Sequence, residues 1–154
     1  MSDKLKDLVV NRRARHDYEI LETYETGIVL QGTEVKSLRD NGGSLAEAYC
    51  KVLTDELWLV ACSIAPYRFG NIHNHEEKRQ RKLLMHKNEI EKLRRAMQEK
   101  GLTVVPLSMY LNKRGRVKVS IGLARGKKLH DKRSAIKERD EKRAMQRTLK
   151  QDRD

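Results

Sequence analysis

The first stretch with a regular pattern of apolar and polar positions runs from Tyr18 to Leu30. Tyr18, Ile20 and Tyr24 occupy even positions, Gly27 interrupts the pattern, and three apolar residues follow directly after it. Alternation of this kind is typical of a half-buried strand, and a glycine between two strand-like runs is typical of a turn. The pattern predicts a β-hairpin over Tyr18–Leu30.

A short helix is predicted next, over the stretch "TEVKSLR", residues 33–39, which Gly32 precedes. Thr33 is a residue type that caps helix N-termini, and Val35 and Leu38 are three positions apart, on one face. The run Asn41, Gly42, Gly43 is expected to end it.

A second hairpin is predicted in "AEAYCKVLTDELWLVACSI", residues 46–64. Two apolar, β-rich runs flank Thr54, Asp55 and Glu56, which supply turn chemistry. Pro66 is expected to stop the second strand. Residues 70–82 are polar and end in a basic run, so an exposed loop is predicted there.

The period then changes to helical between Leu84 and Lys100, where Ile90, Leu93 and Met97 recur at spacings of three and four. Gly101 is placed to end this helix.

Two further strands follow in "LTVVPLSMYL" and "RVKVSIGL", with "NKRG" as the connecting tip. Pro106 lies inside the first and indicates an edge position or a bulge, because proline cannot donate to a strand ladder. About six short strands, one short helix, one longer helix and no βαβ rhythm predict a mainly β fold with α-helices. Its expected architecture is a small closed antiparallel β-barrel of the oligonucleotide-binding (OB) type over residues 1–125.

The net charge of the chain indicates the class of partner to expect. The 154 residues hold 34 Lys and Arg against 22 Asp and Glu, a net charge of +12. The stretch 126–154 holds 11 of these basic residues and 6 of the acidic ones, so the excess is shared by the barrel and the tail. An excess of this size indicates a polyanionic partner.

The tail, residues 126–154, is rich in helix-forming residues but has no continuous apolar stripe. Leu129, Ile136 and Ala144 fall on one side of a helical projection, and Met145 and Leu149 fall on the other. An isolated helix of this length is marginal in water, so we expect the tail to become helical only on binding. Counterion release in an RNA-walled channel would favour that step.

Cellular location and cofactor chemistry are constrained by what the sequence lacks. It has no signal-peptide pattern and no run of eighteen apolar residues, so we expect a soluble, cytoplasmic protein without a membrane partner. Cys50 and Cys62 have no CxxC spacing and are predicted to be buried hydrophobes. "GLARGKK" lacks the spacing and the hydroxyl of a phosphate-binding loop. The histidines show no metal-ligand spacing, and we predict no metal and no cofactor.

Two function classes remain from the residues themselves. In the first, the basic clusters contact RNA phosphates: Arg12, Arg13 and Arg15; Lys78, Arg79, Arg81 and Lys82; and Lys36, Arg39 and Lys118. The alternative is a metal-independent ribonuclease in which two histidines act as acid and base.

Several stretches, in order along the chain, resemble the small protein B family, the partners of bacterial transfer-messenger RNA. They are "NRRARHDYEI", "ETGIVLQGTEVKSLR", "SIAPY", "RKLLMHK", "KGLTVVPL" and "GKKLHDKR". The resemblance implies an OB-type barrel with three helices and a C-terminal tail that is disordered when free. It also implies a monomeric RNA-binding adaptor rather than an enzyme, which holds the tRNA-like domain, joins elongation factor Tu indirectly through the charged RNA, and enters stalled ribosomes.

The resemblance also implies which residues contact RNA. Together with the basic clusters, the candidates are Asn11, Arg12, Arg13, Glu25, Lys36, Arg39, Arg81, Lys82, Leu84, His86, Lys118, Lys127 and Lys128. Glu25 is expected to accept hydrogen bonds from base amino groups or to orient a neighbouring arginine. Leu84 is expected either to lie under an unstacked base or to pack in the core, and His86 to stack or donate.

For the tail, the resemblance implies a place at the ribosomal decoding centre and in the mRNA channel. Gly126 would be the hinge, His130 would stack on the decoding bases, and Asp131, Lys132 and Arg133 would fix the helix start. Ile136 and Met145 would make the few apolar contacts.

Overall fold

The computed structural model describes residues 4–70 and 74–126, which form nine strands and three helices. The strands are β1 (Lys4–Val10), β2 (Tyr18–Ile28), β3 (Gly43–Ser44), β4 (Tyr49–Leu53), β5 (Glu56–Val60), β6 (Ser63–Ile64), β7 (Arg81–Leu84), β8 (Thr103–Asn112) and β9 (Val117–Gly126). The helices are α1 (Ala14–Asp17), α2 (Gly32–Arg39) and α3 (Lys87–Lys100). None of the helices in this part of the chain is both long enough and apolar enough to cross a membrane.

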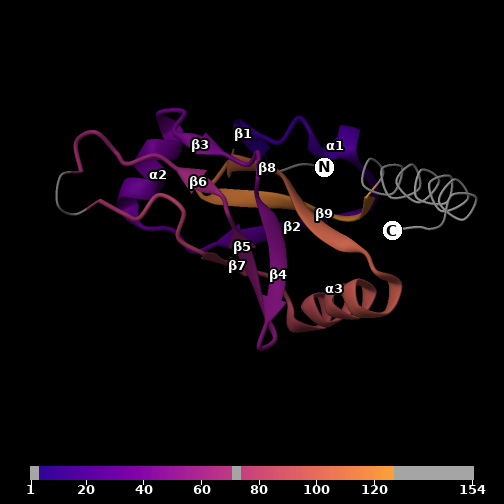
Figure 1. The fold of residues 1–154 in the computed structure, drawn as a ribbon. Helices are drawn as coiled ribbons and strands as arrows, with labels where there is room; N and C mark the ends of the chain where they lie inside the picture. Colours follow the sequence, from indigo (N-terminus) through magenta and orange to yellow (C-terminus); the bar gives the residue numbers. More distant parts are fainter. Residues whose placement is uncertain (1–3, 71–73, 127–154) are drawn as a thin grey trace, which may run out of the picture.

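Six strands close into a ring (Figure 1). The hydrogen-bonded order is β8-β4-β5-β7-β2-β9, and β9 pairs back with β8, with every pairing antiparallel. Closure leaves these strands few free edges, because backbone groups on both sides are paired. The predicted six-stranded barrel with three helices is confirmed. In Figure 1, α2 lies to the left of the ring and α3 to the lower right.

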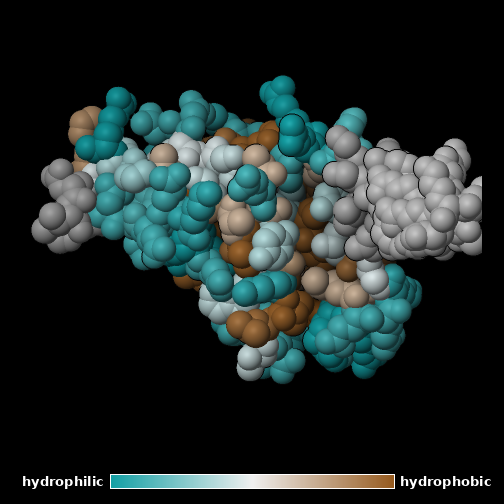
Figure 2. Space-filling model, viewed as in Figure 1, coloured by the Kyte–Doolittle hydropathy of each residue, from teal (hydrophilic) through white to brown (hydrophobic). Residues whose placement is uncertain are grey.

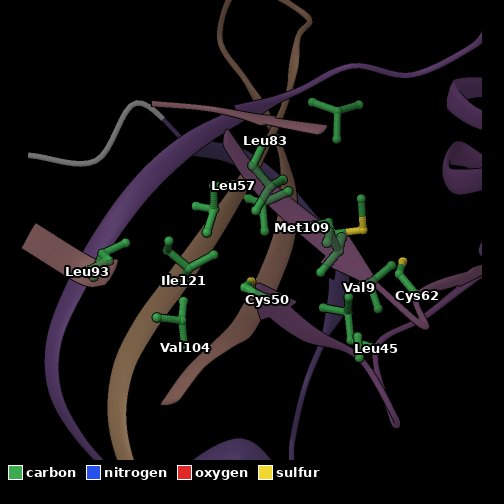
Figure 3. Close-up of a cluster of buried hydrophobic side chains, with 14 of the residues drawn as sticks. Val9, Leu45, Cys50, Leu57, Cys62, Leu83, Leu93, Val104, Met109 and Ile121 are labelled. Atoms are coloured by element: carbon green, nitrogen blue, oxygen red, sulfur yellow. The ribbon is translucent and has the colours of Figure 1, made fainter. Parts of the chain in front are cut away.

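The core fills the inside of this ring (Figure 3). Leu57, Leu83, Val104 and Ile121 come from four different strands and meet there, fully or almost fully buried. Cys50 and Cys62 are buried free thiols, as predicted. Burial raises the pKa of Cys62 to about 11, so the thiol stays protonated and behaves as a small apolar group.

Hydrophobic residues also reach the surface at the tip of the β4–β5 hairpin (Figure 2).

The predicted hairpin over Tyr18–Leu30 is wrong, because β2 is one continuous strand. It pairs with β9 from Tyr18 to Gly27, and its last residues also pair with β7. Gly27 lies within the strand: a Cβ there would come within 3.3 Å of the Leu84 Cβ. The glycine permits close approach of a neighbouring side chain rather than a turn.

The sequence did not indicate β1. Only Val9 of its seven residues is buried, and the strand pairs with β8 alone, outside the ring. Lys4, Lys6 and Asp7 give it the charged composition of an edge strand, so it lacks the alternation by which strands are recognised.

The starts of α2 and α3 differ from their predicted positions. The N-cap of α2 is Gln31 rather than Thr33, and Glu34 completes a capping box with it. Helix α3 begins at Lys87 rather than Leu84, because residues 81–84 form β7, and this strand also shortens the predicted loop over 70–82. Gly101 ends α3 in the left-handed conformation, φ 64°, as predicted.

The β4–β5 hairpin is confirmed, with Thr54 and Asp55 at positive φ in a two-residue turn. The second strand stops at Val60 rather than near Pro66: Ala61 has φ 63°, and residues 63–64 leave the ring to pair with β3. Pro106 lies at a register shift in β8, an interior strand of the ring, so the predicted bulge is confirmed and the alternative edge position is wrong.

Candidate nucleic-acid interface

The outer side of the barrel around Gly27 gathers residues that are far apart in sequence. Gly27 on β2 is opposite Leu84 on β7 and opposite Lys118 on β9. Leu84 is 49% exposed, and Leu84 and Lys118 both line a shallow pocket of about 310 Å³. Arg116 and Val35 line the same pocket. Apolar side chains and two cations therefore share one open depression.

Glu25 lies two positions before Gly27 and so on the same side of β2. It is exposed, and its carboxylate accepts a hydrogen bond from the Tyr110 hydroxyl. Tyr110 comes from β8, where it is opposite Lys118. We call Glu25, Leu84, Tyr110 and Lys118 the β2 face. Sequence reasoning missed Tyr110, because a tyrosine within an apolar strand gives no sign of its hydroxyl partner.

His86 is close to this face along the chain. It is the N-cap residue of α3, two positions after Leu84, and it is exposed with no side-chain capping hydrogen bond. Its imidazole is therefore not used to hold the start of the helix.

Asn11, Arg12 and Arg13 line a different pocket, of about 290 Å³, together with residues 43–46. Asn11 has a structural role as well: its side-chain nitrogen donates to the Pro106 carbonyl at 2.8 Å, and its backbone nitrogen donates to the Leu107 carbonyl at 2.8 Å. The bulge in β8 is thus fastened to the start of this basic cluster. Arg12 and Arg13 are exposed.

Lys36 and Arg39 do not lie on the β2 face. They line a third pocket, of about 260 Å³, with Tyr67 and Arg68. Val35, one residue earlier on α2, faces the first pocket instead, because adjacent helix positions point about 100° apart. Lys36 and Arg39 therefore belong to another surface.

The interpretation of Arg81 as a phosphate contact is corrected by its burial. Its side chain is 0% exposed, and its Nε donates to Glu34 Oε2 at 2.5 Å. Its terminal nitrogens donate to carbonyls of Cys62, Arg79 and Glu77 at 2.8, 3.0 and 3.0 Å. A basic run in the sequence did not distinguish this buried arginine from Lys82, which is partly exposed and pairs with Glu56 at 2.5 Å.

Of the residues predicted for the tail, only Gly126 is described. This predicted hinge is the last residue of β9 and pairs with Tyr18. Lys127, Lys128, His130, Asp131, Lys132, Arg133, Ile136 and Met145 lie outside the described residues.

The described histidines give the ribonuclease alternative no support. His75 is buried, with Nδ1 against Thr33 Oγ1 at 2.9 Å and Nε2 against the Ile64 carbonyl at 2.8 Å. His16 contacts Asp17 on the surface. Over residues 4–70 and 74–126, no three His, Cys, Asp or Glu side chains are grouped as a metal site.

Replacing Tyr110 by phenylalanine is expected to weaken RNA binding about three- to tenfold, roughly 1 kcal/mol, because the Glu25 carboxylate loses its fixed orientation. Fluorescence anisotropy with labelled RNA measures the change. Tyr24→Phe is the matched control, since Tyr24 donates to Glu22 at 2.7 Å elsewhere on β2. Equal losses in the two variants would contradict a specific role for Glu25.

Comparison with known proteins gives one consistent result. The model of the SmpB protein family matches residues 8–151. The chain is 68% identical over 151 residues to the SsrA-binding protein of Protochlamydia amoebophila, covering 98% of each chain. It is 58% identical over 146 residues to that of Chlamydia trachomatis, covering 95% of this chain and 96% of the relative. A solved structure, "tmRNA-SmpB: a journey to the center of the bacterial ribosome", contains a chain with TM-score 0.65 and 51% identity, over 82% of this chain and 85% of the other.

Proposed function

We propose how this chain, which belongs to the SmpB protein family and is an RNA-binding protein of trans-translation, engages its RNA. Its partners are transfer-messenger RNA and the ribosome. The β2 face, with His86 beside it, binds the tRNA-like domain of transfer-messenger RNA. The observation that carries this proposal is the meeting of Gly27, Leu84 and Lys118, from three strands, at one pocket. Glu25 lies two positions before Gly27 on the same side of β2.

Each group on the β2 face has a distinct chemical role in this proposal. Lys118 neutralises a phosphate, and Leu84 lies against an unstacked base. Glu25, fixed by Tyr110, accepts hydrogen bonds from base amino groups, so one carboxylate adds selectivity to a cationic surface. Exposed His86 stacks or donates.

The remaining candidate residues, the Asn11 amide and seven cations, position the RNA without reading its sequence. Within the proposal, phosphates are contacted by Asn11, Arg12, Arg13, Lys36, Arg39, Lys82, Lys127 and Lys128. Arg81 is not included, because its side-chain nitrogens already donate to acceptors within the protein. Lys82 exchanges its surface partner Glu56 for phosphate at little cost, since exposed ion pairs are weak.

The tail supplies the second activity. Residues 126–154 enter the mRNA channel of a ribosome that lacks messenger, and become helical there. His130 and the run Asp131, Lys132, Arg133 lie at the decoding centre in this proposal. Messenger and tail compete for one volume and one set of RNA phosphates, so only an empty channel accepts the protein. This detection by exclusion needs no catalytic residue.

We also propose that the chain acts in the cytoplasm as a monomer and is not an enzyme. It meets elongation factor Tu only through the charged RNA. Peptide-bond formation and decoding belong to the ribosome and to transfer-messenger RNA.

Alanine variants of the β2 face test the proposed RNA site. Lys118→Ala is expected to weaken binding of the tRNA-like domain and to lower the slope of log affinity against log salt by about 1, because one phosphate contact is lost. Leu84→Ala is expected to weaken binding about tenfold without changing the slope, since stacking is not ionic.

Lys100→Ala is the matched control, because Lys100 is an exposed lysine at the end of α3, away from the β2 face. A loss with Lys100→Ala as large as with Lys118→Ala would overturn the proposed location and leave only a diffuse charge effect.

A further inference from the structure

A second exposed surface is formed by α2 and the loop that follows β6. Lys36 and Arg39 of α2 meet Tyr67 and Arg68 of the loop, and Phe69 lies beside them. We call these five residues the Phe69 patch. In Figure 1 the loop extends past α2, away from the barrel. Phe69 is 68% exposed, the largest exposed fraction among the large hydrophobic residues that the structure describes.

The aromatic rings and the cations of the patch are in contact. The Tyr67 and Phe69 ring centroids are 5.4 Å apart at an interplanar angle of 72°. The Arg68 guanidinium carbon is 5.1 Å from the Phe69 centroid, and Lys36 Nζ is 5.9 Å from the Tyr67 centroid. Cations are therefore placed at both rings, within the range of cation–π attraction.

The turn that carries the rings is held to the body of the protein. Ser37 Oγ donates to the Ala65 carbonyl at 2.6 Å. The Asn74 side chain bonds both the backbone nitrogen of Tyr67, at 2.8 Å, and its carbonyl, at 2.6 Å. The Gly70 nitrogen also donates to the Tyr67 carbonyl at 2.8 Å, closing the turn. The rings are thus positioned before any ligand arrives, which lowers the entropic cost of binding.

The charge of the patch favours an anionic ligand. Three cations, Lys36, Arg39 and Arg68, face one carboxylate, Asp40, which lies 3.6 Å from Arg68 and is itself exposed. The pocket is shallow and lined mostly by polar residues, so it offers no apolar groove for a helix or a strand of another protein. An exposed ring among cations matches an unpaired nucleotide, whose base stacks and whose phosphates need neutralising.

We propose that the Phe69 patch binds an unpaired stretch of RNA, with a base stacked on Phe69 and the flanking phosphates held by Lys36, Arg39 and Arg68. This inference rests on the proposed function in one respect, that the chain is an RNA-binding protein. That function already gives Lys36 and Arg39 phosphate contacts. The inference goes beyond it by joining them with Arg68 and the Phe69 ring into one site for unpaired RNA, separate from the β2 face. One molecule can then hold a folded RNA on the β2 face and a single-stranded segment on the Phe69 patch.

A tryptophan placed in the patch reports on stacking directly. Trp58 is the only tryptophan in the chain, and its Nε1 has no hydrogen-bond partner within the described residues, so Trp58→Phe loses no hydrogen bond there. In the full-length Trp58→Phe background, Phe69→Trp provides the only indole. Titration with a uridine oligonucleotide of about ten nucleotides is expected to quench its fluorescence to saturation. An RNA duplex of the same length is expected to quench it little.

Control variants separate stacking from general charge attraction. Tyr49→Trp in the same background places an indole at a 45% exposed position outside the patch, and it is expected to show no quenching. In the native background, Phe69→Ala is expected to weaken oligonucleotide binding about tenfold, and Phe69→Tyr to retain it. Equal quenching at positions 49 and 69, or displacement of the RNA by polyglutamate at equal charge concentration, would overturn the proposal.

Adding Leu84→Ala to the chain that carries Phe69→Trp distinguishes this proposal from that of the β2 face. Unchanged quenching of the indole at position 69, together with weaker binding of the tRNA-like domain, supports two separate sites. Unchanged quenching with unchanged binding of that domain overturns the β2 face alone. Loss of quenching in the Leu84→Ala chain overturns the independence of the Phe69 patch.

Discussion

Replacing Arg81 by alanine is expected to lower the free energy of unfolding by about 3 to 5 kcal/mol, because the substitution removes a fully buried partner of the Glu34 carboxylate and the donor of several backbone carbonyls. The Glu34 side chain is 0% exposed and contacts Arg81 and Arg79, each at 2.5 Å. Arg81 also joins β7 to the carbonyls of Cys62 and Glu77. The loss is measured as a lower urea midpoint, followed by circular dichroism.

Arg95→Ala provides the matched comparison. Arg95 pairs with Glu91 at 3.1 Å on α3, but its side chain is 66% exposed, so the change is expected to stay below about 1 kcal/mol. An Arg81→Ala chain as stable as the Arg95→Ala chain would show that the Glu34 network does not hold α2 to the barrel.

The same network makes stability depend on pH. Burial by itself raises the pKa of Glu34, but hydrogen bonds from Arg79, the Gln31 nitrogen and Arg81 outweigh burial and hold the pKa below its usual value of 4.5. Because the folded-state pKa is the lower one, the unfolded chain binds more protons. The contribution of Glu34 is therefore full above about pH 4.5 and is lost as the pH falls through the folded-state pKa. Glu34→Gln is expected to remove that part of the acid sensitivity.

Removing residues 130–154 is expected to abolish peptide tagging on stalled ribosomes while leaving affinity for the tRNA-like domain largely unchanged. The physical reason is the proposed division of labour: the β2 face holds the RNA, and the tail fills the empty channel. Tagging in a reconstituted translation reaction and a binding titration measure the two activities separately.

A chain with residues 130–154 in scrambled order is the control, because it keeps the charge of the tail and loses the order from His130 to Arg133. Loss of tagging with the scrambled tail would assign the effect to sequence rather than to charge. Equal loss of affinity and tagging on truncation would refute the division of labour.

Local patterns were sufficient to predict several parts of the fold. The β4–β5 turn, the end of α3 at Gly101 and the bulge at Pro106 depend on residues whose backbone preferences act within a few positions. The number of strands in the ring agreed only in total, because the predicted hairpin over Tyr18–Leu30 is the single strand β2, and β7 lies in a stretch predicted to be loop and helix. The prediction for β2 was wrong because a glycine between apolar residues can mark either a turn or, as at Gly27, a strand position that a neighbouring leucine approaches closely.

The burial and the contacts of individual side chains were harder to predict, because they depend on which strands become neighbours. Arg81 and Lys82 are adjacent in one basic run, yet alternation along β7 sends the first into the core and the second outward. The sequence predicted that Lys36 contacts RNA, but it did not indicate that Tyr67 and Phe69 lie near it. Their proximity to Lys36 results from the packing of a loop, distant in sequence, against α2. Glu25 was chosen by resemblance, and its partner Tyr110 came only from the structure.

Titration of the full-length chain with the isolated tRNA-like domain of transfer-messenger RNA, at several salt concentrations, tests the central claim most directly. The account predicts a saturable complex that weakens steeply with salt, contains intact RNA, and is tighter than the complex with a plain duplex of equal length. Equal affinity for the duplex, or cleavage of the RNA during the titration, would contradict it.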